Sequence, residues 1–154
     1  MSIDTRVLYG YSFEKIWDEV KAFVQSADKE TLEANLRYQD EESGGDTALH
    51  WACYRNAPLA VFLAIFGACS DKGVDIGSIL SIVGRCGSMV LHCAAARCGD
   101  IEVVNMLTQA YPEAVQQKDG NGTTPLDQVR SQNCTGAKDA IVHHLEQVSL
   151  GVRW

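Results

Sequence analysis

Three segments of this chain share one residue pattern, and the repetition limits the folds that the chain can adopt. The segments begin at Thr47, Met89 and Thr124, so their starts lie 42 and 35 residues apart. A pattern that returns every few tens of residues indicates stacked supersecondary units. Spacings in this range are typical of helix pairs, which stack into an elongated surface instead of enclosing a deep pocket.

The first two segments align without a gap at a constant offset of 42 residues. Within residues 49–65 and 91–107, seven of seventeen aligned pairs are identical or alike. The pairs are Leu49 with Leu91, His50 with His92, Ala52 with Ala94, Arg55 with Arg97, Leu59 with Ile101, Val61 with Val103 and Ile65 with Leu107. The third segment opens with Asp119, Gly122, Thr124, Pro125 and Leu126.

This pattern resembles the ankyrin repeat, whose unit carries Asp-x-x-Gly-x-Thr-Pro-Leu-His-x-Ala-Ala and then a second helix with a Val-Val-x-x-Leu face. The resemblance implies an all-α fold, an ankyrin-repeat α-solenoid of stacked antiparallel helix pairs. It also implies that His50 and His92 are structural and hydrogen-bond across adjacent turns. The second copy departs from the family at Met89, and the third has Asp127 in place of the histidine.

Local chemistry predicts where the first helix of each copy begins. Thr47 and Thr124 are suited to the N-cap, and Pro125 to the first helical position. The second copy has no threonine there, so its cap comes from Ser88 or is absent. Three glycines precede the motifs by two residues, where a turn can require positive φ: Gly45, Gly87 and Gly122.

Apolar residues at helical spacing predict the buried faces. In the first helices they lie at i, i+3 and i+4, and in the second helices at i and i+4. The residues are Leu49, Ala52 and Cys53; Leu91, Ala94 and Ala95; Val61 with Ile65, Val103 with Leu107, and Ile141 with Leu145.

The chain is expected to form a single domain over residues 1–154. Apolar spacing predicts a helix over 14–25 that Ser12 caps, a helix over 29–38 that Asp28 caps, and a last helix over 137–148. The first two would seal the stack as a terminal unit. The expected divisions are an N-terminal capping helix pair at 12–38, repeat 1 at 39–70, a linker at 71–83, repeat 2 at 84–114, and repeat 3 with the C-terminal cap at 115–148.

Charge and hydropathy exclude several classes of partner. The net charge is −7, and residues 1–46 hold eleven acidic and five basic residues. A chain without a basic stripe is not expected to bind nucleic acid, which requires clustered Lys and Arg. No apolar run approaches the ~18 residues of a membrane span, and anionic membrane surfaces are not expected partners.

The N-terminal residues lack the apolar core of a signal peptide. We therefore expect a cytoplasmic protein, with the nucleus as an alternative, and a monomer. In a reducing compartment the six cysteines are expected to be free thiols. One alternative function follows, a thiol-based redox sensor at Cys86 or Cys98, beside Arg85 and Arg97.

Catalytic and metal-binding motifs are not found in the sequence. There is no phosphate-binding glycine loop, nucleophile elbow or His-Glu-x-x-His helix. Cys86, Cys93 and Cys98 lack the paired knuckles of a zinc site, and the adjacent His143 and His144 point in different directions. We therefore expect no enzyme activity, cofactor, metal or small-molecule substrate.

The ankyrin resemblance implies that a protein partner lies against the concave side, formed by turn tips and the exposed face of each first helix. The function we expect is a non-catalytic protein-protein interaction module, and a regulatory or inhibitory subunit of an enzyme is an alternative. Carried over by position, the partner-binding residues are Asp46, Trp51, Tyr54, Arg55, Arg85, Ser88, Arg97, Asn121, Thr123 and Gln132.

Aromatic and arginine side chains are the usual energetic anchors of interfaces. Tyr54, Arg55, Arg85 and Arg97 are therefore the preferred residues, and Trp51 either joins them or packs between repeats. The arginines favour a partner segment that carries carboxylates or phosphates. The alternative is that Arg55 and Arg97 only solvate the concave face.

Overall fold

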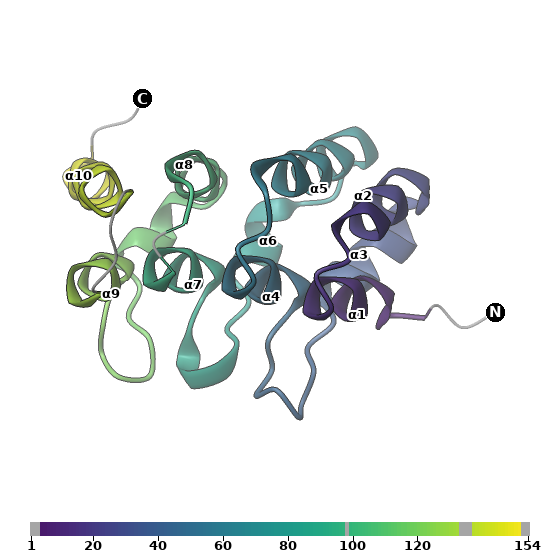
Figure 1. Cartoon of the computed structure of the whole chain (residues 1–154), viewed down its shortest axis with the longest axis horizontal. Coiled ribbons are helices and arrows are strands. Elements are labelled where there is room, and N and C mark those ends of the chain that lie inside the picture. Colours follow the sequence, from purple (N-terminus) through teal and green to yellow (C-terminus); the bar gives the residue numbers. More distant parts are fainter. Residues whose placement is uncertain (1–3, 98, 133–136, 152–154) are drawn as a thin grey trace.

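The computed structural model of the chain describes residues 4–97, 99–132 and 137–151. These residues form helices and two 3₁₀ turns, with one isolated bridge between Asp40 and Asp46 (Figure 1). The helices are α1 Val7–Phe13, α2 Trp17–Ser26, α3 Lys29–Arg37, α4 Ala48–Tyr54, α5 Leu59–Lys72, α6 Ile76–Leu80, α7 Val90–Ala96, α8 Ile101–Ala110, α9 Pro125–Ser131 and α10 Lys138–Ser149, and the 3₁₀ turns are η1 Arg85–Gly87 and η2 Pro112–Gln116.

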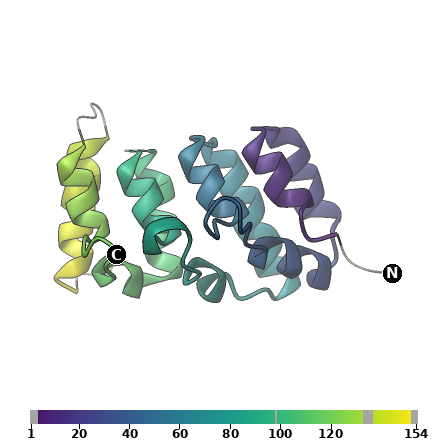
Figure 2. The same cartoon turned by 90° about the horizontal axis from the view of Figure 1, so that it is seen from below.

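Eight of the ten helices in the described residues lie in two rows, and α3 and α6 lie outside them. One row consists of α1, α4, α7 and α9, each seven residues long, which contact one another in that order. We call it the short-helix row. The second row contains α2, α5, α8 and α10, and the two ends of the described chain lie at opposite ends of the array. Figure 2 shows the same side-by-side order from below.

The predicted starts of the first helices in copies one and three are confirmed. The hydroxyls of Thr47 and Thr124 accept hydrogen bonds from the backbone N–H groups of His50 and Asp127, and Pro125 occupies the first turn of α9. Met89, the N-cap of α7, provides no side-chain cap. The predicted positive φ is found at 93° for Gly45, 72° for Gly87 and 78° for Gly122.

The predicted apolar faces are also confirmed. The first-helix and second-helix residues form part of one buried hydrophobic cluster that runs between the two rows. Each of the predicted residues is at most 5% exposed: Leu49, Ala52, Cys53, Leu91, Ala94, Ala95, Val61, Ile65, Val103, Leu107, Ile141 and Leu145.

Three turns precede the last three helices of the short-helix row. Each turn is closed by a backbone hydrogen bond: from Asp40 N–H to the Asp46 carbonyl at 3.2 Å, from Gly84 N–H to the Ser88 carbonyl at 2.8 Å, and from Asp119 N–H to the Thr123 carbonyl at 2.9 Å. Side by side, the turns are also joined to one another. Arg85 N–H donates to Asp46 Oδ1 at 2.8 Å, and Gly120 N–H donates to the Cys86 carbonyl at 2.7 Å.

The two buried histidines connect each helix to the next turn, as the resemblance implies. His50 Nδ1 lies 3.1 Å from the Thr47 backbone nitrogen, which donates to it, and His50 Nε2 lies 3.0 Å from the Ser88 carbonyl oxygen. His92 repeats the arrangement with Met89 N–H and the Thr123 carbonyl. In α9 the Asp127 carboxylate accepts from Thr124 N–H instead. No later turn follows α9 within the described residues, so a second ring nitrogen is not needed there.

The N-terminal prediction was wrong in its helix boundaries. A helix over 14–25 capped by Ser12 is replaced by α1 and α2, with Lys15 at φ 60° between them, and Ser12 lies buried inside α1. The apolar spacing continues through this tight turn, which conceals the break. Only the following helix matches the prediction, since the Asp28 side chain accepts from Thr31 N–H at the start of α3.

Two boundaries differ elsewhere. Residues 71–72 of the expected linker belong to α5, and α6 lies inside the linker, where Asp75 caps it by accepting from Ser78 N–H. The predicted last helix over 137–148 corresponds to α10 with its ends shifted by one residue. Within the described residues, the longest helix is α5 with 14 residues, and none is both long and apolar enough to span a bilayer.

Lys72 secures the end of α2 from the neighbouring helix. Its ammonium group donates to the carbonyl oxygens of Val24 at 2.6 Å, Gln25 at 3.1 Å and Ala27. We expect Lys72→Met to lower the free energy of unfolding by about 1.5–3 kcal/mol, because charge-assisted hydrogen bonds to orphan helix carbonyls are lost.

Urea unfolding followed by circular dichroism measures this change. Lys118→Met is the matched control, because Lys118 is exposed and makes no side-chain hydrogen bond to a described residue. Equal effects of the two substitutions would show that Lys72 only solvates the surface.

Candidate functional site

Five aromatic side chains form a continuous surface over the first two short helices. Tyr9 and Phe13 come from α1, Trp51 and Tyr54 from α4, and Tyr38 from the end of α3. Successive ring centroids lie 5.6 Å apart for Tyr38–Tyr9, 6.5 Å for Tyr9–Trp51, 4.9 Å for Phe13–Trp51 and 5.6 Å for Trp51–Tyr54, in edge-on contacts. We call this group the aromatic strip. Phe13 is 39% exposed and the other four rings are partly exposed.

The polar atoms of the strip are hydrogen-bonded among themselves. Trp51 Nε1–H donates to the Tyr9 hydroxyl at 3.1 Å, and the Tyr9 hydroxyl donates to Asp40 Oδ2 at 3.4 Å. Tyr38 donates to the other oxygen of the same carboxylate at 3.2 Å. Burial raises the pKa of Tyr9, and the nearby Asp40 carboxylate acts in the same direction. The network holds the rings in place and directs their polar atoms toward the 40–46 turn.

Arg55 lies at the opposite end of the strip from Asp40. Its guanidinium carbon is 5.2 Å from the Phe13 ring centroid and 5.3 Å from that of Trp51, within the range of cation–π attraction. The Nε atom is buried and has no hydrogen-bond partner among the described residues. Arg37 and Arg130, by contrast, are paired with Glu33 and Glu146.

The other two predicted arginines occupy different settings. Arg97 is exposed, and its Nε donates to the Tyr54 carbonyl oxygen at 3.0 Å, so it bridges α7 and α4. Arg85 is exposed on the second turn, with its aliphatic stem against Gly44 of the first turn. The three predicted arginines therefore do not form one cluster, and only Arg55 among them lies against rings of the strip. Arg6, which was not predicted, lies over the Tyr38 ring at 5.6 Å.

The remaining predicted site residues divide into buried and exposed groups. Asp46 is 0% exposed and holds Arg85 N–H, so its prediction as a surface contact was wrong: the carboxylate points inward to tie two turns together. Ser88 and Thr123 are partly exposed, and their carbonyls receive the histidine bonds. Asn121, in the turn before α9, is exposed, and Gln132, at the end of α9, is partly exposed; α9 packs against α7, beyond the helices that carry the strip.

Sequence reasoning missed Tyr9, Phe13 and Tyr38. Tyr9 and Phe13 could have been found by aligning α1 with α4, two helices of equal length that begin at residues 7 and 48. Each of the two helices ends with the same kind of backbone hydrogen bond. In α1 it runs from Ile16 N–H to the Tyr11 carbonyl, and in α4 from Ala57 N–H to the Ala52 carbonyl, each at 2.9 Å. Their turn residues Lys15 and Asn56 both have positive φ, at 60° and 52°. Only a leucine in the second helical position survives from the motif.

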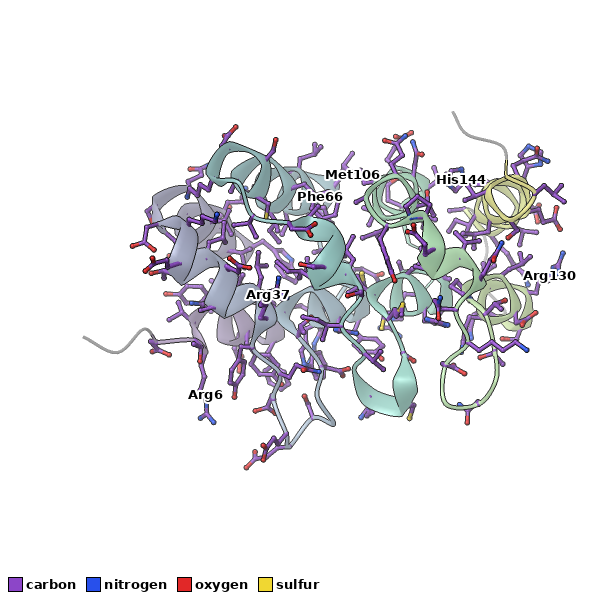
Figure 3. All side chains as sticks on the ribbon, turned by 180° about the vertical axis from the view of Figure 1, so that it is seen from behind. Arg6, Arg37, Phe66, Met106, Arg130 and His144 are labelled. Atoms are coloured by element: carbon purple, nitrogen blue, oxygen red, sulfur yellow. The ribbon has the colours of Figure 1, made fainter. Side chains whose placement is uncertain are left out.

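A separate cleft of about 340 Å³ opens between the α4–α5 and α7–α8 connections. Its inner wall is apolar and includes Phe62 and Val103, and its rim carries Asn56, Arg97 and Asp100. None of the residues that line the cleft belongs to the aromatic strip, so the cleft is a separate feature of the surface. Figure 3 shows Arg6 at one end of the array and Arg130 and His144 at the other.

The described cysteines differ in exposure. Cys53, Cys69 and Cys93 are buried, and burial raises the pKa of Cys69 to about 11 and of Cys93 to about 12, so these thiols stay protonated. Cys86 is exposed at the second turn, and Cys98 lies outside the described residues.

Metal-ligating residues do not converge in the described part of the chain, where no group of three or more His, Cys, Asp or Glu is placed to hold an ion. His143 is exposed as predicted, whereas His144 is partly buried, with Nε2 2.7 Å from Thr108 Oγ1.

No protein-family model matches this chain, and no curated protein matches it.

Proposed function

We propose that the chain is an ankyrin-repeat protein. Four seven-residue helices that contact in series support this class, as do the threonine caps, the positive-φ glycines and the histidines that bond to the next turn. In this proposal α1 and α2 are a divergent first repeat, α9 with α10 the last, and the array is an α-solenoid. Repeats of this kind stack because each buries its neighbour's face.

We infer that the protein binds a protein partner across the short-helix row, without catalysis. The observation that carries this proposal is the aromatic strip, in which partly exposed Tyr, Trp and Phe rings surround an arginine. These residue types dominate the binding energy of interfaces. Tyr54 packs against the core, but the other four rings of the strip are not among the side chains that cover it.

The rigidity of the strip also favours binding. Trp51, Tyr9 and Tyr38 are fixed by the hydrogen bonds to one another and to Asp40. A partner therefore meets rings that lose little conformational entropy on association. Free thiols at the four described cysteines support the expected reducing, cytoplasmic location. A regulatory or inhibitory subunit would use the same surface and differ only in its partner.

Phe13→Ser is expected to abolish capture of the partner from a native extract, because it removes the most exposed ring of the strip and one support of Arg55. The matched control is Leu63→Ser, which removes an exposed apolar side chain, 53% accessible, from α5 in the other row. Proteins captured by the wild type, and by each variant, are compared by quantitative mass spectrometry.

The proposal requires a protein that is retained by the wild type and by Leu63→Ser but lost with Phe13→Ser. Circular dichroism and thermal unfolding of both variants show that the fold is intact. Loss with Leu63→Ser but not with Phe13→Ser would place the interface on the second row and overturn the proposal.

A further inference from the structure

We propose that Arg55, held against the rings of Phe13 and Trp51, is the anchor for an acidic segment of the protein partner, and that it binds a carboxylate or phosphate oxyanion. This inference rests on the proposed function, because it names the chemistry that the aromatic strip recognises. It also assigns a direction to the bound segment.

The two rings leave Arg55 with unused hydrogen-bond donors. A guanidinium has five N–H groups and no acceptor, and its Nε is buried without a partner, while no carboxylate of the described residues forms an ion pair with Arg55. Arg6 and Arg85 also lack recorded ion pairs, but they are exposed and therefore hydrated. Arg55 is partly buried, so its hydration is restricted by the same rings that hold it.

Contact with two aromatic rings restricts a guanidinium without consuming its hydrogen-bond donors. The cation–π contacts lie on the faces of the Phe13 and Trp51 rings. A planar guanidinium that is already oriented matches a carboxylate or a phosphate by parallel, charge-assisted hydrogen bonds, which are about twice as strong as neutral ones. The rings beside it then pack against the apolar part of the same segment.

The charges at the two ends of the strip have opposite sign. Arg55 contacts Phe13 and Trp51 at one end, whereas the acidic turn with Asp40, Glu41 and Glu42 follows Tyr38 at the other. Arg6 lies over the Tyr38 ring at this second end, but the three carboxylates outnumber its single positive charge. An acidic residue of the partner is attracted to the first end and repelled from the second. The bound segment therefore has an acidic end over Arg55, apolar residues over the rings, and a neutral or basic end over the turn.

The test uses a phage-displayed library of random peptides, selected on the purified full-length chain. Enriched peptides are expected to carry Asp or Glu next to apolar residues, with Lys or Arg toward the other end. Each peptide is then synthesised with the acid changed to its amide. Its affinity for the wild-type chain is expected to fall at least about tenfold, since an ionic hydrogen bond is lost.

A double-mutant cycle assigns that loss to Arg55. With Arg55→Gln the acidic and amide peptides are expected to bind equally, and Arg55→Lys should restore only part of the difference. Arg130→Gln is the matched control, because Arg130 is an arginine at the far end of the array. A phosphoserine version of each peptide separates the sources: tighter binding than the Asp peptide identifies a phosphorylated segment, and weaker binding a carboxylate.

The outcomes separate the two proposals. Enriched peptides without acidic residues, whose binding is lost with Phe13→Ser, would overturn the assignment of Arg55 and retain the aromatic strip as a binding surface. Acidic peptides that bind Arg55→Gln as well as the wild type would do the same. Enriched peptides that bind Phe13→Ser undiminished would contradict the proposed function itself.

Discussion

Gly84→Ala is expected to lower the free energy of unfolding by about 3–5 kcal/mol, because the site combines overpacking with the loss of a charged hydrogen bond. A Cβ atom at this position would lie 2.3 Å from Asp46 Oδ1 and 2.9 Å from His50 Nε2. Both atoms are engaged, with the Asp46 oxygen accepting from Arg85 N–H and the histidine bonded to the Ser88 carbonyl. Neither side chain has an exposed direction in which to move, since both are 0% exposed.

Thermal and urea unfolding measure this effect. The matched control is Gly10→Ala in α1, where no heavy atom lies within 4 Å of the added Cβ. Alanine is there expected to stabilise the helix by about 0.5–1 kcal/mol through its higher helix propensity. Combining Gly84→Ala with Asp46→Ala should recover part of the loss, because the closest contact is removed. If Gly84→Ala is as harmless as Gly10→Ala, the turns are not packed as described.

The helices that the sequence predicted best are those whose start is determined by adjacent residues. In α4 and α9 a threonine cap and a preceding glycine each have a local reason to be where they are. Such features act within a few residues, so they are visible in the sequence. The helix α7 was predicted although no side chain caps it, because its apolar face of Leu91, Ala94 and Ala95 was enough to indicate a helix.

The first repeat of the proposed array was not visible because almost none of its motif residues remain. Tyr9 takes the place of the histidine, and its hydroxyl bonds to Asp40 in the following turn. Leu8 is fixed by a contact that is remote in sequence, from its backbone N–H to Asn35 Oδ1 at 3.0 Å. Without this helix the sequence predicted Trp51, Tyr54 and Arg55 by position but not the rings that surround them.

Asp46 shows a different limit of sequence reasoning. Its position in a turn favours an exposed carboxylate, yet it points inward because Arg85 N–H, 39 residues away, needs an acceptor. This hydrogen bond forms only when the two turns lie side by side. A local pattern does not reveal this contact. Asn121 at the third turn is exposed, and its assignment to partner binding stays a prediction.

Lowering the pH from about 6.5 to 5 is expected to destabilise the protein, chiefly through His50 and His92. Burial lowers the pKa of both histidines below the ordinary value of 6.5, although hydrogen bonds and nearby carboxylates oppose the shift. In this interval the unfolded chain takes up protons that the folded chain does not bind. Stability is therefore lost as the pH falls through 6.5, and the loss continues down to the folded-state pKa.

The hydrogen-bond geometry gives the physical reason. Backbone N–H groups of Thr47 and Met89 donate to the Nδ1 atoms of His50 and His92, so each Nδ1 must be an acceptor and each Nε2 carries the proton. A second proton on Nδ1 would face another N–H donor in a buried site. Each histidine should contribute as much as about 1.4 kcal/mol per pH unit where only the unfolded state is protonated.

Urea unfolding at a series of pH values between 7.5 and 5, about the range in which histidines titrate, measures this dependence. The double variant His50→Gln/His92→Gln should be less stable than the wild type at neutral pH, yet lose less stability on acidification. His143→Gln, at an exposed histidine, should keep the wild-type slope. Asp119 does not interfere: although burial raises its pKa, hydrogen bonds from Thr123, Asn121 and Gln128 hold the value at about 2, so its contribution is lost only as the pH falls from about 4 toward 2. A wild-type stability that is flat or rises from 6.5 to 5 would contradict neutral, bridging histidines, because protonation would then have to be as favourable in the folded state as in the unfolded chain.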